Sequence, residues 1–139
     1  MKRILITTDF SANSKHTIEY VLDFLHDTKI LSEILLVNTF MVQQTDPLQV
    51  IRQNDEFKMR SRAGLEKEKT EALKKINNSN ISVNTSSHMG TLSNVILQLL
   101  KKEKIDLVAM GKDGGRHVET VAALLREKEC PLLITYLKE

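Results

Sequence analysis

The sequence predicts an α/β fold in which an open parallel sheet carries helices on both of its faces. Five short runs rich in Ile, Leu or Val recur along the 139 residues, at 4–8, 34–39, 81–85, 107–110 and 132–136. Segments with helical spacing of apolar residues lie between these runs, and no Asn-Gly hairpin turn joins one run to the next. Strands that alternate with helices in this way are connected by right-handed crossovers, which make the strands parallel.

Most of the five runs are continuously apolar, which is typical of strands that are covered on both faces. The run at 81–85, Ile-Ser-Val-Asn-Thr, alternates between apolar and polar residues instead. Alternation predicts a strand with one face toward water. We therefore expect this strand to lie at an edge of the sheet.

Apolar residues spaced three and four apart predict the helices, because this spacing places them on one helical face. One such stripe consists of Ile18, Val21, Leu22 and Leu25. Another consists of Leu92, Val95, Ile96, Leu99 and Leu100. Residues 117–120 are expected to form the first turn of the last helix.

A long charged segment at 50–76 predicts a helix that is mostly exposed to solvent. Glu66, Glu68 and Glu71 interleave with lysines, a pattern that favours ion pairs within the helix over a surface for nucleic acid. Asp46 followed by Pro47 is typical of a helix N-cap and first helical residue. We expect the helix to begin at this pair.

Composition narrows the class of protein. The formal net charge is only +2, from 20 Lys and Arg against 18 Asp and Glu, so we expect no nucleic-acid partner. No window approaches the roughly 18 consecutive apolar residues of a membrane-spanning helix, and the start lacks a signal-peptide core. The single cysteine, Cys130, cannot form an internal disulfide. We expect one cytoplasmic domain over residues 1–139 with no membrane partner.

Motifs of common enzyme classes are missing from the sequence. The Walker pattern, the dinucleotide-binding G-x-G-x-x-G and the zinc-binding H-E-x-x-H do not occur. The 4 histidines are dispersed, and no serine or cysteine has a recognisable nucleophile motif around it. The sequence therefore predicts no catalytic residue and no metal site.

Two segments are candidates for a ligand site, because open parallel sheets bind ligands at the carboxyl ends of their strands. The first is 7–11, Thr-Thr-Asp-Phe-Ser, in which Asp9 ends the first strand. The second is 111–116, Gly-Lys-Asp-Gly-Gly-Arg, whose glycines allow backbone amides to face an anion. Each has a structural alternative. Asp9 could cap the next helix with Ser11 or Ser14, and the glycines could serve only a tight turn.

Four sequence elements carry a family resemblance: ILITTDFS at the start, Gly90 followed by Ile96, DLVAMG-x-x-G, and C-P-L-L-I-T near the end. In this order and spacing they resemble the universal stress protein family over nearly the whole chain. The resemblance implies an adenine nucleotide alpha hydrolase-like fold with strand order 3-2-1-4-5 and four helices. In that order Asp9 and the glycine loop would converge on one cleft, at the point where the strand order reverses.

The resemblance also implies a nucleotide site in this cleft. Asp9 matches a carboxylate that meets the nucleoside, Val37 matches an aliphatic wall against adenine, and Met110-Gly111 with Gly114 match half of a phosphate loop. The loop is about five residues shorter than in the family pattern, and Thr120 matches its last position. The implied cofactor is ATP with magnesium. The candidate binding residues are Asp9, Val37, Met110, Gly111, Gly114, Gly115, Arg116 and Thr120.

Glu119 argues against tight binding of ATP, because it stands where the family pattern has glycine. The free amides of a first helical turn attract anions, and the Glu119 carboxylate would occupy those amides and repel a triphosphate. Lys112 and Arg116 have the opposite effect. These cations favour a smaller anion, or a phosphate that lies elsewhere in the loop.

Residues 131–136, Pro-Leu-Leu-Ile-Thr-Tyr, would form an apolar strand at the other edge of the sheet, and an open edge invites pairing. The resemblance implies an antiparallel homodimer through this strand. We expect a universal stress protein that acts as a non-catalytic regulatory or protective module. Two alternatives stay open: a nucleotide-binding switch that hydrolyses ATP slowly, and an adaptor for an unknown protein partner.

Overall fold

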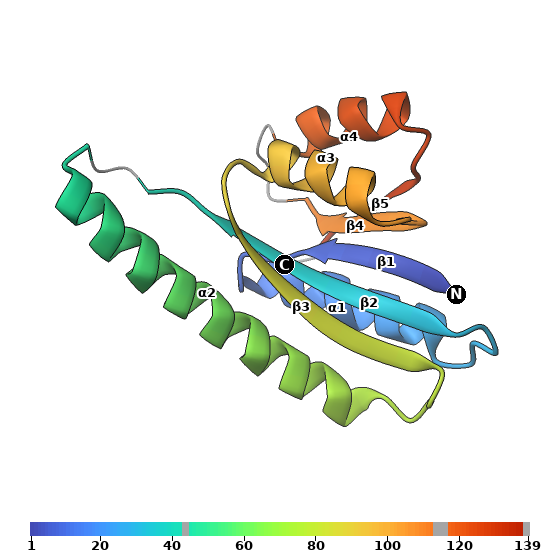
Figure 1. Cartoon of the computed structure of the whole chain (residues 1–139). Helices are drawn as coiled ribbons and strands as arrows, with labels where there is room; N and C mark the ends of the chain where they lie inside the picture. Colours follow the sequence, from blue (N-terminus) through green and yellow to red (C-terminus); the bar gives the residue numbers. More distant parts are fainter. Residues whose placement is uncertain (43–44, 113–116, 138–139) are drawn as a thin grey trace.

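The computed structural model describes residues 1–42, 45–112 and 117–137 (Figure 1). Within these residues the strands are β1 (Lys2–Thr7), β2 (Ser32–Phe40), β3 (Ile81–Met89), β4 (Leu107–Gly111) and β5 (Leu132–Thr135). They form one sheet in the order β3-β2-β1-β4-β5, and every neighbouring pair is parallel. The predicted fold class and strand order are confirmed.

The helices are α1 (Ala12–Leu25), α2 (Pro47–Lys75), α3 (Leu92–Lys102) and α4 (His117–Glu127). α1 and α2 cover one face of the sheet, and α3 and α4 cover the other (Figure 1). Successive residues of one strand supply both cores: Ile4 and Ile6 pack toward α1 and α2, whereas Leu5 packs toward α3 and α4. This explains why the predicted strands are continuously apolar.

Local signals in the sequence set where the helices begin. Ser11 caps α1 by accepting a hydrogen bond from the backbone amide of Ser14. Asp46 caps α2 by accepting one from Leu48, and Pro47 takes the first helical position, as predicted. The predicted stripe of α1, from Ile18 to Leu25, is buried.

The 29-residue helix α2 is buried only in its second half. Its buried residues are Ser61, Leu65, Glu68 and Ala72. Glu68 departs from the predicted pattern of surface pairing, because it turns inward and accepts a hydrogen bond from Thr8. Lys75 pairs across to Glu19 of α1 rather than within its own helix. None of the helices in the described part of the chain has the length and apolar character needed to cross a bilayer.

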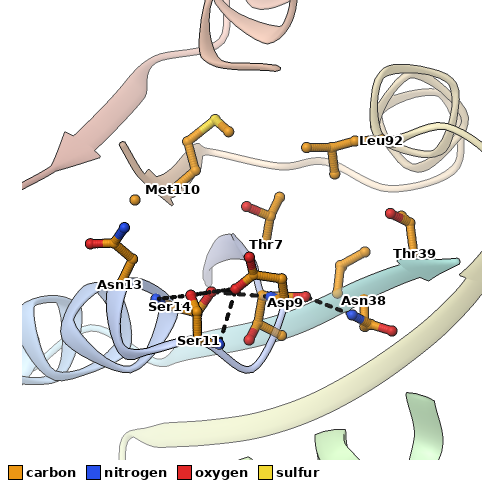
Figure 2. A pocket seen from close by; sticks show the side chains of 12 residues that line it. Thr7, Asp9, Ser11, Asn13, Ser14, Asn38, Thr39, Leu92 and Met110 are labelled. Atoms are coloured by element: carbon orange, nitrogen blue, oxygen red, sulfur yellow. Dashed lines mark hydrogen bonds between the residues drawn. The ribbon is translucent and has the colours of Figure 1, made fainter. Parts of the chain in front are cut away.

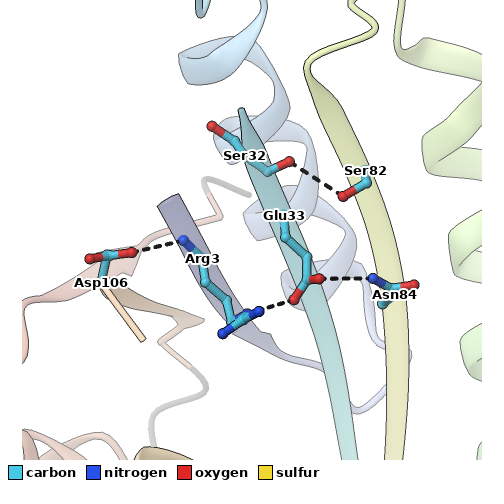
Figure 3. Close-up of polar contacts among 6 residues, drawn as sticks. All are labelled: Arg3, Ser32, Glu33, Ser82, Asn84 and Asp106. Atoms are coloured by element: carbon cyan, nitrogen blue, oxygen red, sulfur yellow. Dashed lines mark hydrogen bonds and ion pairs between the residues drawn. The ribbon is translucent and has the colours of Figure 1, made fainter. Parts of the chain in front are cut away.

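β3 is an edge strand, as its alternating sequence predicted: Ile81 is buried, whereas Asn84 is exposed. A polar network near the amino ends of the strands ties the sheet together (Figure 3). Glu33 on β2 accepts hydrogen bonds from Arg3 Nε of β1 at 2.8 Å and from Asn84 Nδ2 at 3.0 Å. The Arg3 backbone amide donates to Asp106 at 2.9 Å. This network lies at the end of the sheet opposite to the predicted site.

Candidate functional site

A cleft with a volume of about 170 Å³ opens at the carboxyl end of the sheet, where β1 lies between β2 and β4 (Figure 2). It is formed by the ends of these three strands and by the starts of α1 and α3. Its lining residues are Thr7, Thr8, Asp9, Ser11, Asn13, Ser14, Val37, Asn38, Thr39, Leu92, Met110 and Gly111. The cleft thus lies where the strand order reverses, and it brings together Asp9, Val37, Met110 and Gly111 of the predicted set.

The two carboxylate oxygens of Asp9 differ in their hydrogen bonds. Its Oδ1 accepts hydrogen bonds from the Ser11 amide at 3.0 Å and from Ser14 Oγ at 2.7 Å. The alternative that Asp9 supports the start of α1 is therefore correct, although Ser11 is the N-cap itself. The side chain is exposed, and among the described residues none forms a hydrogen bond with Oδ2. A ligand in the cleft can therefore donate to this oxygen.

The protonation state of Asp9 follows from two opposing effects. Partial burial alone would raise the pKa of Asp9, but the hydrogen bonds from Ser11 and Ser14 favour the charged form and outweigh burial. The pKa of Asp9 therefore lies below its usual value. At neutral pH the cleft holds a carboxylate, which is suited to accept hydrogen bonds from hydroxyl groups.

The turn after β1 is fixed from two sides. On the β2 side, Asn38 Nδ2 donates to the Thr8 carbonyl at 2.7 Å, and the Thr8 amide donates to the Val37 carbonyl at 2.9 Å. On the α2 side, Thr8 Oγ1 donates to Glu68 at 2.7 Å and accepts from the Phe10 amide at 3.1 Å. The backbone around Asp9 is thus held by contacts to elements on both sides.

Apolar side chains border the cleft around this carboxylate. Val37 of β2 and Met110 of β4 are buried, and Leu92 at the start of α3 is half-buried. Figure 2 shows the side chains of Met110 and Leu92. Sequence reasoning missed Leu92 and the polar residues Asn38 and Thr39. The available signals were that Asn38 and Thr39 directly follow Val37 at a strand end, and that Leu92 follows the Gly90 turn.

Gly111 has a packing role that the sequence did not predict. A Cβ atom at this position would lie 3.1 Å from Thr17 Oγ1 and 3.2 Å from the Asn13 carbonyl oxygen. Gly111 therefore permits the close approach of α1 to β4. Next to it, the Lys112 carbonyl accepts a hydrogen bond from Asn13, and the Lys112 ammonium lies 5.3 Å from the centre of the Tyr136 ring.

The other half of the predicted site surrounds the loop that joins β4 to α4. Gly114, Gly115 and Arg116 lie outside the described residues. Glu119 and Thr120 are in the first turn of α4, as predicted, and both are exposed. Their role toward a phosphate stays a prediction. Within the described residues no group of three or more His, Cys, Asp or Glu side chains could hold a metal ion.

Comparisons with known proteins agree with this fold. A model of the universal stress protein family matches residues 1–135. A universal stress protein family member from Burkholderia pseudomallei is 17% identical with a TM-score of 0.72, covering 96% of this chain and 95% of that chain. An Arabidopsis thaliana member with AMP bound is 17% identical, with a TM-score of 0.70 and coverage of 99% and 93%.

A third solved structure, from Archaeoglobus fulgidus, is a universal stress protein in complex with dAMP. It is 10% identical, with a TM-score of 0.61, and the match covers 96% of this chain and 97% of that chain. At these identities the solved structures establish a common fold. No curated protein sequence is a significant match to the chain.

Proposed function

Because the chain belongs to the universal stress protein family, we propose that it is a non-catalytic regulatory or protective module of the stress response that binds a small adenine nucleotide. The observation that carries this proposal is a charged carboxylate, Asp9, beside apolar side chains at the strand-order reversal. Solved proteins of the same fold that hold AMP, cAMP and dAMP support it. The proposal places the protein in the cytoplasm as one domain over residues 1–139, where its free Cys130 is compatible with a reducing compartment.

In this proposal different parts of the cleft contact the base, the ribose and the phosphate of the nucleotide. The base lies against Val37, with Leu92 and Met110 at its other side. The ribose hydroxyls donate to the free Oδ2 of Asp9. The phosphate points toward the loop after β4 and the first turn of α4, where helix amides attract an anion.

We propose a nucleoside monophosphate as the ligand, in preference to ATP with magnesium. Glu119 places a negative charge in the first turn of α4, so a triphosphate directed there meets repulsion and a monophosphate meets less. The Lys112 ammonium, the cation nearest to Gly111 in sequence, lies over the ring of Tyr136.

Titration calorimetry with AMP and with ATP in the presence of magnesium tests this function. We expect AMP to bind more tightly than ATP. Asp9→Asn keeps an oxygen for the start of α1 but replaces Oδ2 by an amide nitrogen, which donates and cannot accept from the ribose, so it should weaken AMP binding about tenfold. Asp23→Asn, on the exposed surface of α1, is the matched control and should bind as the parent does.

Glu119→Gln supplies a second arm of the same experiment. Removal of this charge should strengthen ATP binding more than AMP binding, whereas Glu127→Gln at the far end of α4 should leave both unchanged. Absence of AMP and ATP binding up to millimolar concentration would contradict the proposed ligand. That result would favour the adaptor alternative.

We also propose a homodimer formed through β5. β5 ends the sheet order and pairs only with β4 among the described strands. Leu132, Leu133 and Ile134 are half-buried, and Tyr136 is 60% exposed. An apolar strand with one unpaired edge is suited to antiparallel pairing with a second copy about a two-fold axis, over residues 131–136.

Light scattering on the parent and on Ile134→Glu tests the dimer. We expect the mass of a dimer for the parent and the mass of a monomer for the variant, because a two-fold axis brings two like charges together at the paired edge. Glu66→Lys is the control, because Glu66 lies on the exposed face of α2, the helix that packs over β2 and β3. This variant should remain dimeric. A monomeric parent at micromolar concentration would refute the proposal.

A further inference from the structure

Glu68 of α2 lies beneath the turn that carries Asp9. Its side chain is only 4% exposed. One carboxylate oxygen accepts the hydrogen bond from Thr8 Oγ1 at 2.7 Å, and the other has no hydrogen-bond partner among the described residues. A buried carboxylate with an unpaired oxygen is costly, so the helix alone does not explain a glutamate here.

A second contact joins α2 to the same turn, one helical turn before Glu68. The Phe10 ring packs against Gly64 so closely that a Cβ at Gly64 would lie 2.6 Å from Phe10 Cζ. Phe10 has a φ of 67°, a region that bulky residues rarely adopt and that persists only where the surroundings hold it. Because the Phe10 amide donates to Thr8 Oγ1, both contacts with α2 act on one short backbone segment.

The charges around Glu68 come from three elements. Burial is the main cause that raises its pKa, and the negative charges of Glu71 and Asp9 raise it further. The hydrogen bond from Thr8 and the positive charge of Lys15 on α1 oppose this rise without cancelling it. The space between α1 and α2 is also lined by Glu19 and Lys75, which pair with each other.

We propose that Glu68 is a positioning residue for the cleft, which holds Asp9 in its binding conformation through Thr8 and releases this hold when the Glu68 carboxyl ionises. The inference rests on the proposed function, because it names a regulation of that same site. A carboxyl buried under Thr8 binds its proton more tightly than one turned out toward Lys15 and water. By linkage, raising the pH favours the turned-out carboxylate and leaves the Thr8 hydroxyl without its acceptor.

The same linkage fixes the sign for stability. The folded pKa of Glu68 lies above the unfolded value, so its contribution is fully present below the unfolded pKa and is lost as the pH rises through the folded pKa. Asp9 behaves oppositely: its contribution is present above the unfolded pKa and is lost as the pH falls through the lowered folded pKa. Because the pKa of Asp9 is lowered and that of Glu68 is raised, Asp9 is already charged at the pH where Glu68 loses its proton, and Glu68 is the carboxyl of this pair that responds as the pH rises.

The affinity for adenosine between pH 5 and 8 tests the inference, because this probe carries no phosphate that titrates. The parent should lose affinity several-fold as the pH rises.

Glu68→Gln keeps an oxygen for the Thr8 hydroxyl but cannot ionise, so its affinity should vary less with pH and exceed that of the parent at pH 8. Glu68→Leu removes the acceptor and should bind several-fold more weakly at every pH. Glu66→Gln, exposed on the same helix, should follow the parent. Equal pH profiles for the parent and Glu68→Gln would overturn the inference.

A second measurement needs no ligand and separates this inference from the proposed function. NMR hydrogen exchange of the Phe10 amide, corrected for its intrinsic pH dependence, reports on its bond to Thr8. Protection should fall in the parent as the pH rises, stay constant in Glu68→Gln and be low throughout in Glu68→Leu. If adenosine fails to bind while this pattern holds, the proposed ligand is wrong and the positioning role stands. If protection is the same in all three proteins, the positioning role is wrong.

Discussion

Replacement of Gly111 by valine is expected to lower the free energy of unfolding by about 2–3 kcal/mol. The first added carbon would already lie 3.1 Å from Thr17 Oγ1 and 3.2 Å from the Asn13 carbonyl oxygen. The Asn13 oxygen belongs to the backbone of α1 and accepts a hydrogen bond from Thr17, so it cannot move without disturbing the helix. Two further methyl groups then require α1 and β4 to separate.

Urea denaturation of the parent, Gly111→Ala and Gly111→Val measures this effect. The loss should grow from alanine to valine with a similar denaturant slope. Ala63→Val on the exposed face of α2 is a control for the introduction of a β-branched residue and should cost less than about 1 kcal/mol. If the three proteins unfold at equal midpoints and Gly111→Val no longer binds AMP, the packing role is wrong. The glycine would then serve to leave space for the phosphate of the ligand.

Replacement of Asn38 by leucine should cost about 1–3 kcal/mol of folding free energy and also weaken AMP binding. Asn38 is 8% exposed, and its Nδ2 donates to the Thr8 carbonyl at 2.7 Å. Leucine fills a similar volume but leaves this carbonyl without its donor in a buried place. The turn after β1 then loses its side-chain contact with β2, and Asp9 moves with the turn.

Thermal unfolding and calorimetry on the same samples test both effects. Asn84→Leu is the matched control, because it removes an exposed amide that donates to Glu33 at the opposite end of the sheet. This control should unfold within about 0.5 kcal/mol of the parent and bind AMP equally well. A stable Asn38→Leu protein with unchanged affinity would show that the contacts from α2 suffice to hold the turn.

Much of the fold was predictable because burial on both faces leaves a direct mark on the sequence. Apolar runs identified the strands, and the alternating run at 81–85 identified one edge, whereas the apolar run at 132–136 did not by itself show that β5 is the other edge. Asp9, Val37, Met110 and Gly111 were predictable as neighbours, since the carboxyl ends of parallel strands meet at one end of the sheet. The segments 7–11 and 111–116 followed from local patterns and one general rule of topology, whereas the strand order and the choice of Val37 and Met110 followed from the family resemblance.

Glu68 and Asn38 were not predictable in the same way. Glu68 lies among charged residues that face solvent, and its burial depends on Thr8, a partner 60 positions away in the sequence. The available signal was its spacing from Leu65 and Ala72, which places it on their helical face. The burial of Asn38 likewise depends on a distant partner, because its side-chain amide donates to the Thr8 carbonyl at the end of another strand. A polar residue can be buried where a group that is distant in the sequence supplies its hydrogen bond, and the pattern of a single sequence does not show such a partner.

β1 is the first strand along the chain and the central strand of the sheet, so Ile4 pairs with Ile34 on one side and with Leu107 on the other. As the polypeptide leaves the ribosome, β1, β2 and β3 can assemble with α1 and α2. The edge of β1 and the apolar Leu5 and Val37 then remain uncovered until α3 and β4 have been synthesised. We therefore expect a nascent chain to expose an unpaired edge of β1 until β4 has been synthesised, and the cleft at the carboxyl end of the sheet is completed only when Met110 and Gly111 are in place.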